Sequence, residues 1–344
     1  MTGSLPGLDL PALQQYFDLH VPEASGPISA DLVHGGRSNL TYRLSDGRTS
    51  WVLRRPPLGG LTPSAHDVAR EYRVVAALYG SGVPVARAVA LCEDPSVLGC
   101  AFSLVEYVSG AVVRSREDLD RYGPAELARC AHGLIEVLAA LHAVPYGDVG
   151  LSGFGRPEGF LARQVGRWSD QWQRVATREL RDIDALRGRL AETTPATGGA
   201  AVVHGDFRID NAIFADDDLG TMRALVDWEM ATLGDPLTDL ALHLVYRDPA
   251  FEPVLAGSAA STSERLPAPE DLAERYARVS GRDLGRLDFY LALGYFKIAV
   301  IAEGIYARHR QGLTVGEGFD TVGAAVPQLA AAGLRALNRK TATA

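Results

Sequence analysis

The chain has 344 residues, of which 47% are hydrophobic and 22% charged, and its formal net charge is −8. This length allows about two domains with a large core, and the acidic balance argues against a nucleic-acid-binding protein. The chain has three cysteines without a CxxC pair, which favours neither a disulfide framework nor a zinc site. It shows neither a secretory signal nor a run of 18 apolar residues, so we expect a cytoplasmic protein with no membrane partner.

The first hundred residues are predicted to form strands around one helix. The segments "PISADLVHGG" and "NLTYRLSDG" flank a Gly-Gly turn, and Asp46-Gly47 starts a hairpin into the strand "SWVLRRPP". The stretch 61–82 predicts a helix, with Thr62 or Ser64 as cap, Pro63 in its first turn and an apolar stripe that begins at Val68. Two more strand-like runs follow and end in "CAFSLVEYVSG".

From about residue 115 the pattern becomes helical. Leucine and alanine recur at helical spacing over 127–141, and Pro145 stops that helix. A weaker, more charged helical region covers 156–191. Two short strands are predicted at 201–204 and 223–226, and further helices near 236–247, 267–282, 286–311 and 320–337.

The segment "HGDFRIDN" (204–211) places a polar cluster at the end of an apolar strand. Such a cluster is costly unless it is paired, liganded or catalytic. Asp206 and Asn211 lie in this loop, and "VDWE" delivers Asp227 and Glu229 after a second strand. Magnesium prefers carboxylate and amide oxygens and usually takes only one or two protein carboxylates, which leaves Asp206 to accept a proton from a hydroxyl.

These two motifs resemble the catalytic core of the aminoglycoside phosphotransferase (choline-kinase-like) family, relatives of protein kinases. "HGDFRIDN" is similar to the kinase catalytic loop with Gly205 in place of arginine, and "DWE" stands in place of D-F-G. The resemblance implies that Asp206 is the catalytic base and that Arg208 offsets charge on the transferring phosphate. It also implies that Asn211 and Asp227 bind magnesium, with Glu229 as an extra metal contact or water ligand. HGD alone would also fit a metal-hydrolase fragment or a satisfied polar turn.

A kinase-like nucleotide site needs a cation on the third strand, paired with a helix glutamate. Only Lys297 and Lys340 are lysines, so the predicted cation is Arg54, with Glu71 as its partner. Arg55 is the substitute if the strand register differs by one. Glu71 on a solvated helix edge is the alternative interpretation.

The rest of the nucleotide site is predicted from position. Gly35, Gly36, Ser38 and Asn39 lie where backbone amides would face phosphate, although a plain hairpin turn explains them nearly as well. "LVEYVSG" resembles the kinase hinge, where backbone groups near residues 106–108 would meet adenine: Glu106, Tyr107 and Val108.

Several other polar residues receive structural interpretations. His204 and Asp210 are expected to hydrogen-bond the loop. Asp235 and Asp239 of "GDPLTDLA" are predicted as turn and helix-start residues. Most of 286–312 is expected to be core, and Lys297 either contacts a substrate anion or extends to solvent.

The predicted fold is α+β and protein-kinase-like, with two lobes. Residues 1–108 form a small β-rich nucleotide-binding lobe with one helix, and 109–344 a larger, mainly helical lobe with the catalytic loop, metal site and acceptor pocket. The predicted function is transfer of a phosphoryl group from ATP, with Mg²⁺, to a small-molecule hydroxyl. The flanking motifs "VLRRPP", "PSAHDVAREYRVV" and "GDPLTDLA" resemble one branch of the family, the bacterial phosphotransferases similar to the kinase domain fused to some eukaryotic acyl-CoA dehydrogenases. That branch is linked to hydroxyacyl thioesters, so a hydroxyacyl-CoA or hydroxy acid is the preferred acceptor. An aminoglycoside or other sugar hydroxyl, use of GTP, and a nucleotide-binding pseudokinase are the alternatives, and the sequence does not indicate an oligomeric state.

Overall fold

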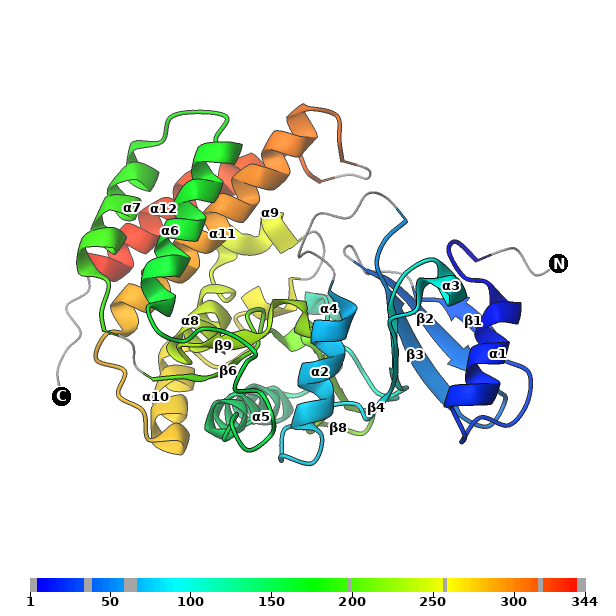
Figure 1. Ribbon diagram of the computed structural model, residues 1–344. Helices are drawn as coiled ribbons and strands as arrows, with labels where there is room; N and C mark the ends of the chain where they lie inside the picture. The colour runs from blue at the N-terminus through cyan, green and yellow to red at the C-terminus, as the bar shows by residue number, and fades with distance from the viewer. Residues whose placement is uncertain are drawn as a thin grey trace. The chain divides into compact units, whose positions relative to one another are not determined.

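The fold is taken from a computed structural model that describes residues 5–33, 39–58, 67–196, 199–255, 259–314 and 318–338. The chain divides into two units, whose elements can be followed in Figure 1. Unit 1 contains residues 1–110 and 223–231, and unit 2 contains residues 111–222 and 232–344.

Unit 1 is built on one antiparallel sheet with the strand order β1-β2-β3-β5-β4. The strands are β1 (Ser29–Leu32), β2 (Leu40–Ser45), β3 (Ser50–Arg55), β4 (Ala88–Cys92) and β5 (Phe102–Glu106). Burial alternates along β3, so that Trp51, Leu53 and Arg55 point to one face and Val52 and Arg54 to the other. The same strand therefore supplies both a core and a polar site.

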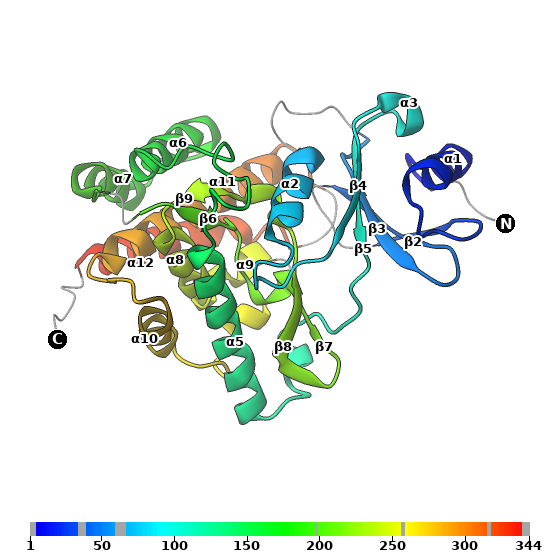
Figure 2. The same ribbon diagram turned by 60° about the horizontal axis from the view of Figure 1, so that its bottom comes forward.

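Helices cover both faces of this sheet, as Figure 2 shows for α1 (Leu10–His20) and α2 (Val68–Leu78). The Phe17 ring of α1 packs edge-on against Trp51 with centroids 5.2 Å apart, in a cluster with Tyr42, Leu53 and other buried residues. Burial of such aromatic and aliphatic side chains is the main stabilising term for a small sheet domain.

The expectation of one helix in the first hundred residues is wrong. Helix α1 and the short α3 (Pro95–Leu98) accompany α2. The signal for α1 was present: Asp9 accepts a hydrogen bond from the Ala12 N–H as N-cap, and Leu13 and Phe17 lie four residues apart on its buried face. The predicted caps of α2, Thr62 and Ser64, and Pro63 lie outside the described residues.

Unit 2 is mainly helical. Its longer helices are α5 (Pro124–Ala143), α6 (Phe160–Val175), α7 (Arg181–Thr193), α8 (Leu237–Val245), α10 (Pro269–Ser280), α11 (Leu287–Arg310) and α12 (Val322–Asn338). The shorter pieces are α4 (Arg116–Leu119), α9 (Glu252–Leu255), η3 (Pro249–Phe251) and η4 (Ala260–Thr262). The predicted helices after residue 115 are therefore confirmed, with 156–191 divided into α6 and α7.

Helix α11 forms the centre of unit 2, where it packs against α6, α7, α8 and α12. It is long and apolar enough to cross a membrane by length and composition, but 67% of that stretch is buried inside the fold. Such burial is typical of the core helix of a globular domain.

Three short strands and one longer strand position the polar motifs. Strand β6 (Ala201–Val203) pairs with β9 (Thr232–Gly234), and β7 (Ala212–Ala215) pairs with β8 (Asp218–Leu225). The second motif strand thus begins earlier than the predicted residue 223. The 3₁₀ turns η1 (Ile209–Asn211) and η2 (Trp228–Met230) follow β6 and β8, so each polar motif lies in a turn after a buried strand.

Candidate active site

The segment "HGDFRIDN" forms a tight loop between β6 and β7 in which Asp206 and Asn211 touch. The Asn211 Nδ2 group donates to the Asp206 carbonyl at 2.9 Å and to its carboxylate Oδ2 at 3.1 Å. The other oxygen, Oδ1, accepts a hydrogen bond from the Tyr246 hydroxyl. The Asp206 side chain is 27% exposed, so its carboxylate is anchored by two residues and still meets the surface.

Asp239 of α8 holds the backbone of this loop from behind. Its two carboxylate oxygens accept the N–H groups of His204 at 2.6 Å and Gly205 at 2.8 Å, and its Oδ2 lies 3.4 Å from His142 Nε2. Gly205 has φ +84°, which a residue with a Cβ adopts only with strain. Asp239 lies in the first turn of α8, as predicted, but its carboxylate binds the loop and does not cap its own helix.

Two further side chains fix the same loop. The Lys297 Nζ of α11 donates to the Gly205 carbonyl at 2.8 Å, and a ring nitrogen of His243 lies 3.3 Å from the Phe207 carbonyl. The first contact corrects the expectation that Lys297 extends to solvent, because its ammonium binds the loop that carries Asp206. The loop is therefore held at His204, Gly205 and Phe207, and such preorganisation is what positional catalysis requires.

The charge of Asp206 is stabilised by its surroundings. Burial works against ionisation, but Arg208, the Tyr246 hydrogen bond, Lys297 and His204 together lower the pKa of the carboxyl group. The Arg208 guanidinium lies 3.6 Å from Asp206 Oδ1 and 2.8 Å from Asp210 Oδ2. Asp206 is thus an ionised hydrogen-bond acceptor at neutral pH, suited to orient a hydroxyl group.

Three other polar residues, His204, Asp210 and Asp235, make structural contacts. His204 Nδ1 lies 3.3 Å from the Asp206 N–H, as predicted for a loop hydrogen bond. Asp210, which was expected to hydrogen-bond the loop backbone, forms an ion pair with Arg208 of the same loop. Asp235 Oδ1 accepts the Leu237 N–H at 3.1 Å, which confirms its role at the start of α8.

In unit 1, Arg54 links two carboxylates. Its Nε lies 3.2 Å from Glu71 Oε2, and its Nη2 lies 3.1 Å from Asp227 Oδ1. Asn39 Nδ2 donates to the other Glu71 oxygen at 3.1 Å. The alternative of a solvated Glu71 is wrong, since its side chain is only 6% exposed. Arg55 points to the opposite face, where its guanidinium donates to the Gly7 carbonyl and to Leu98 O at 3.1 Å.

The charges of Arg54 and Glu71 depend on each other, as the direction of their pKa shifts indicates. Burial opposes the Arg54 charge, but Glu71 and Asp227 outweigh it and raise the pKa of Arg54. Burial raises the pKa of Glu71 to about 7, although Arg54 acts in the opposite direction. A buried carboxylate of this kind needs its cation to stay ionised.

Asp227 stands in a strained turn at the end of β8. Its φ of +68° makes it the single non-glycine residue with positive φ in the described part of the chain. The turn is fixed by Leu225, whose N–H donates to Pro84 O at 2.7 Å and whose carbonyl accepts the Trp228 indole N–H at 2.9 Å. Left-handed aspartate is tolerated, and such strain is concentrated at functional sites.

The donor set around Asp227 fits magnesium and not a softer metal. Asp227 and Glu229 present carboxylate oxygens from one turn, and Asp227 is one-third exposed. Within the described ranges, no three His, Cys, Asp or Glu side chains gather to hold a metal ion. A cation here would bind one or two carboxylates and complete its shell with other oxygens, which is the behaviour of Mg²⁺.

The hinge-like segment lies at the end of β5. The N–H groups of Glu106 and Tyr107 donate to the carbonyls of Arg87 and Ser50, at 2.9 and 3.0 Å. Among the described residues, the Val108 N–H has no such bond. The phosphate-loop candidates Gly35, Gly36 and Ser38 lie outside the described residues, and Asn39 is placed against Glu71.

Comparison with known proteins places the chain among phosphotransferases. The profile of the phosphotransferase enzyme family matches residues 29–290. Acyl-CoA dehydrogenase family member 11 of Rattus norvegicus is 34% identical over 342 residues, which cover 97% of this chain but only 44% of that relative. The chain thus spans less than half of the relative's length.

Solved structures of phosphotransferases resemble the chain along nearly its whole length. A Ralstonia eutropha protein that carries the assigned name aminoglycoside phosphotransferase is 31% identical, with a TM-score of 0.84 over 96% of this chain and 98% of its own. A thermostable mutant of aminoglycoside phosphotransferase APH(4)-Ia, in ternary complex with AMP-PNP and hygromycin B, has a TM-score of 0.61 at 18% identity over 97% and 99% of the two chains. The latter likeness shows the fold alone. Together they confirm the predicted α+β, protein-kinase-like fold class.

Proposed function

The chain belongs to the phosphotransferase enzyme family and is a phosphotransferase with an alcohol group as acceptor, and from this premise we propose that it transfers the γ-phosphoryl group of ATP, with Mg²⁺, to the hydroxyl of a small molecule. The observation that carries the proposal is the ionised Asp206 carboxylate, anchored by Asn211 and Tyr246 in a loop fixed by Asp239 and Lys297.

We assign the acceptor side of the reaction to unit 2. Asp206 accepts a hydrogen bond from the attacking hydroxyl and takes its proton as the phosphorus–oxygen bond forms. Arg208 stabilises the negative charge on the transferring group, a role its partly exposed guanidinium supports. In phosphoryl transfer, positioning and charge stabilisation supply most of the rate, so a rigid loop is the main requirement.

We assign the donor side mainly to unit 1. Arg54, oriented by Glu71, contacts the phosphates of ATP through its planar fork, and Gly36, Ser38 and Asn39 contribute backbone groups. At the hinge, Val108 is the proposed donor to adenine because its N–H lacks a protein acceptor among the described residues, with Glu106 and Tyr107 beside it.

Magnesium fits the oxygen donors described above. Its proposed ligands are Asp227 and Glu229 of unit 1 and Asn211 of unit 2, and the bound ion would neutralise charge on the phosphates. The chain's own contribution is to hold these oxygens in place: the turn after β8 fixes Asp227, and the Asp206 backbone fixes Asn211.

A hydroxyacyl-CoA or hydroxy acid is the preferred acceptor class. The relative that matches along nearly the whole chain is named an acyl-CoA dehydrogenase family member, and segment 286–312 contains no dense acidic run of the kind a polycation needs. An aminoglycoside is the second candidate, because a structural neighbour was solved with hygromycin B.

The test is a product assay by mass spectrometry. The purified chain is mixed with Mg²⁺, either ATP or GTP, and a pool of hydroxyacyl-CoAs and hydroxy acids or a pool of aminoglycosides. A product heavier by one phosphoryl group is expected from the first pool with ATP. Asp206→Asn should lower its rate by about 100-fold or more, whereas Asp170→Asn on the exposed face of α6 should not. MgATP binding without a product from either pool would favour the pseudokinase.

A further inference from the structure

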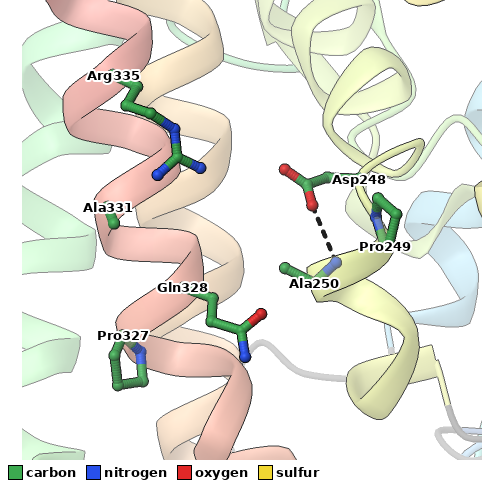
Figure 3. Close-up of a pocket in the computed structure, with 7 residues that line it drawn as sticks. All are labelled: Asp248, Pro249, Ala250, Pro327, Gln328, Ala331 and Arg335. Carbon is green, nitrogen blue, oxygen red and sulfur yellow. Dashed lines mark hydrogen bonds between the residues drawn. The ribbon is translucent and has the colours of Figure 1, made fainter.

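A pocket of about 550 Å³ opens in unit 2 between α12 and the 3₁₀ turn η3. Figure 3 shows its two walls: Pro327, Gln328, Ala331 and Arg335 on one face of α12, and Asp248, Pro249 and Ala250 opposite them. The prolines and alanines make part of the lining apolar, and three polar side chains give it specificity. The lining therefore combines apolar surface with one carboxylate, one amide and one guanidinium.

The α12 wall is held in place by a buried charge network. Pro327 lies inside the helix and lacks an N–H, so the Gly323 carbonyl four residues earlier loses its helical partner. The Arg178 guanidinium donates to that carbonyl and pairs with the fully buried Glu303 at 3.1 Å. The proline on the pocket wall is therefore tied to the core helix α11.

The opposite wall uses its charged residue for structure. Asp248 Oδ1 accepts the Ala250 N–H at 2.9 Å, the bond drawn in Figure 3, and Oδ2 accepts the Tyr295 hydroxyl at 2.9 Å. Both oxygens of Asp248 are thus occupied by neutral donors. The carboxylate is therefore held in place by the fold, and a polycationic ligand would meet the Arg335 guanidinium in the same pocket.

Arg335 is the cation of the pocket that remains available. Its side chain extends from α12 toward the space between the walls (Figure 3), and no hydrogen bond or ion pair joins it to any described residue. A guanidinium presents a planar fork that matches a carboxylate or phosphate. The pocket therefore offers an anion a cationic contact at one wall.

The pocket is connected to the catalytic loop through a short segment. Tyr246, which donates to Asp206 Oδ1, precedes Asp248 by two residues, a backbone reach of at most about 7 Å. Its ring also packs against Phe251 of η3 with centroids 4.7 Å apart. The same segment thus holds the base and forms a pocket wall.

We propose that this pocket binds the anionic end of the acceptor, with Arg335 as the residue that recognises its phosphate or carboxylate group. The inference rests on the proposed function and narrows its substrate class: the acceptor is an anion that presents its hydroxyl to Asp206, and a polycationic aminoglycoside is disfavoured.

The test measures binding directly by calorimetry, with AMP-PNP and Mg²⁺ present to occupy the nucleotide site. Coenzyme A probes phosphate, 4-hydroxybutyrate probes carboxylate and kanamycin probes a polycation. The wild-type chain is expected to bind one of the two anions. Arg335→Ala should weaken that binding about tenfold or more, and Arg335→Lys less, because a charge-assisted bidentate contact is lost in part or whole. Arg174→Ala, a matched change on exposed α6, should bind as wild type.

Equal anion affinity in the wild type and Arg335→Ala, or wild-type binding of kanamycin alone, would overturn the proposal. Circular dichroism establishes that both variants fold. The two proposals fail separately: Arg335-dependent anion binding without any phosphorylated product supports this pocket and contradicts the kinase activity.

Discussion

The guanidinium of Arg54 contacts Glu71 through Nε and Asp227 through Nη2, so two carboxylates share one cation. We predict that Arg54→Ala lowers the phosphoryl-transfer rate about 100-fold, because phosphate contact is lost and Glu71 becomes a buried, unpaired acid. Arg54→Lys should recover part of the rate, since an ammonium keeps the charge but not the fork. Initial rates and nucleotide titrations measure both effects, with Arg48→Ala in the β2–β3 turn as control. A wild-type rate in Arg54→Ala would remove Arg54 from the site.

Lys297 acts on the catalytic loop through a hydrogen bond to the Gly205 carbonyl and through its charge, which lowers the pKa of Asp206. We predict that Lys297→Met lowers kcat about tenfold while the KM for nucleotide stays unchanged, because the loss of that bond loosens the residue before Asp206. The orphaned carbonyl should also cost about 1–3 kcal/mol of unfolding free energy. Lys297→Arg keeps a donor and should restore part of kcat. If Lys297→Met lowers stability alone, the lysine has only a structural role.

At the residue scale, the sequence identified the groups whose chemistry is visible in a motif. The resemblance to kinases predicts the pair of Arg54 and Glu71, strand alternation and helix spacing support it, and the structure brings the two side chains to 3.2 Å. Asp239 and Tyr246 were not recognised as partners of the loop, because they come from α8 and its C-terminal end, more than 30 residues along the chain. A single sequence gives no spacing rule for such contacts, which depend on how the helix packs.

At the scale of elements, hydrophobic periodicity predicted the long helices of unit 2 well, since burial of one apolar face decides where they form. It failed at α1, because the buried face of this short helix is a stripe of only three residues, Leu13, Tyr16 and Phe17. It also gave no sign of the α11–α12 packing, which depends on glycines that permit close approach and on the buried Glu303.

That packing gives a prediction with a matched control. A Cβ at Gly323 of α12 would lie 2.8 Å from the Tyr306 ring of α11, closer than side chains pack, whereas a Cβ at Gly188 of α7 would meet open space. Gly323→Ala should therefore lower the unfolding free energy by about 1–3 kcal/mol through overpacking. Gly188→Ala should raise it by about 0.5–1 kcal/mol, because alanine favours the helix. Urea denaturation of the two variants measures the difference, and an equal effect of both would contradict the close packing.

At the scale of the whole molecule, the buried histidines make the fold sensitive to acid. Burial lowers the pKa of His142, and it lowers the pKa of His243 from 6.5 to about 4. Both lie in unit 2 next to the residues that hold the catalytic loop, His142 beside Asp239 and His243 beside the Phe207 carbonyl. In the unfolded chain these rings take up a proton near pH 6.5, so protonation favours unfolding before it reaches the native rings.

The contribution of His243 is therefore complete above pH 6.5 and is lost as the pH falls from 6.5 to about 4. At 1.36 kcal/mol per pKa unit the full loss is about 3 kcal/mol, and about 2 kcal/mol of it is lost by pH 5. We predict that urea denaturation of the wild type shows this decline between pH 7 and pH 5. His243→Gln retains an amide donor for the Phe207 carbonyl but has no proton to gain, so its stability should fall less over the same range. His20→Gln on exposed α1 should follow the wild type. Parallel pH profiles of the wild type and His243→Gln would mean that the His243 ring does not stay neutral in the native fold, and the acid sensitivity would then have to come from other groups.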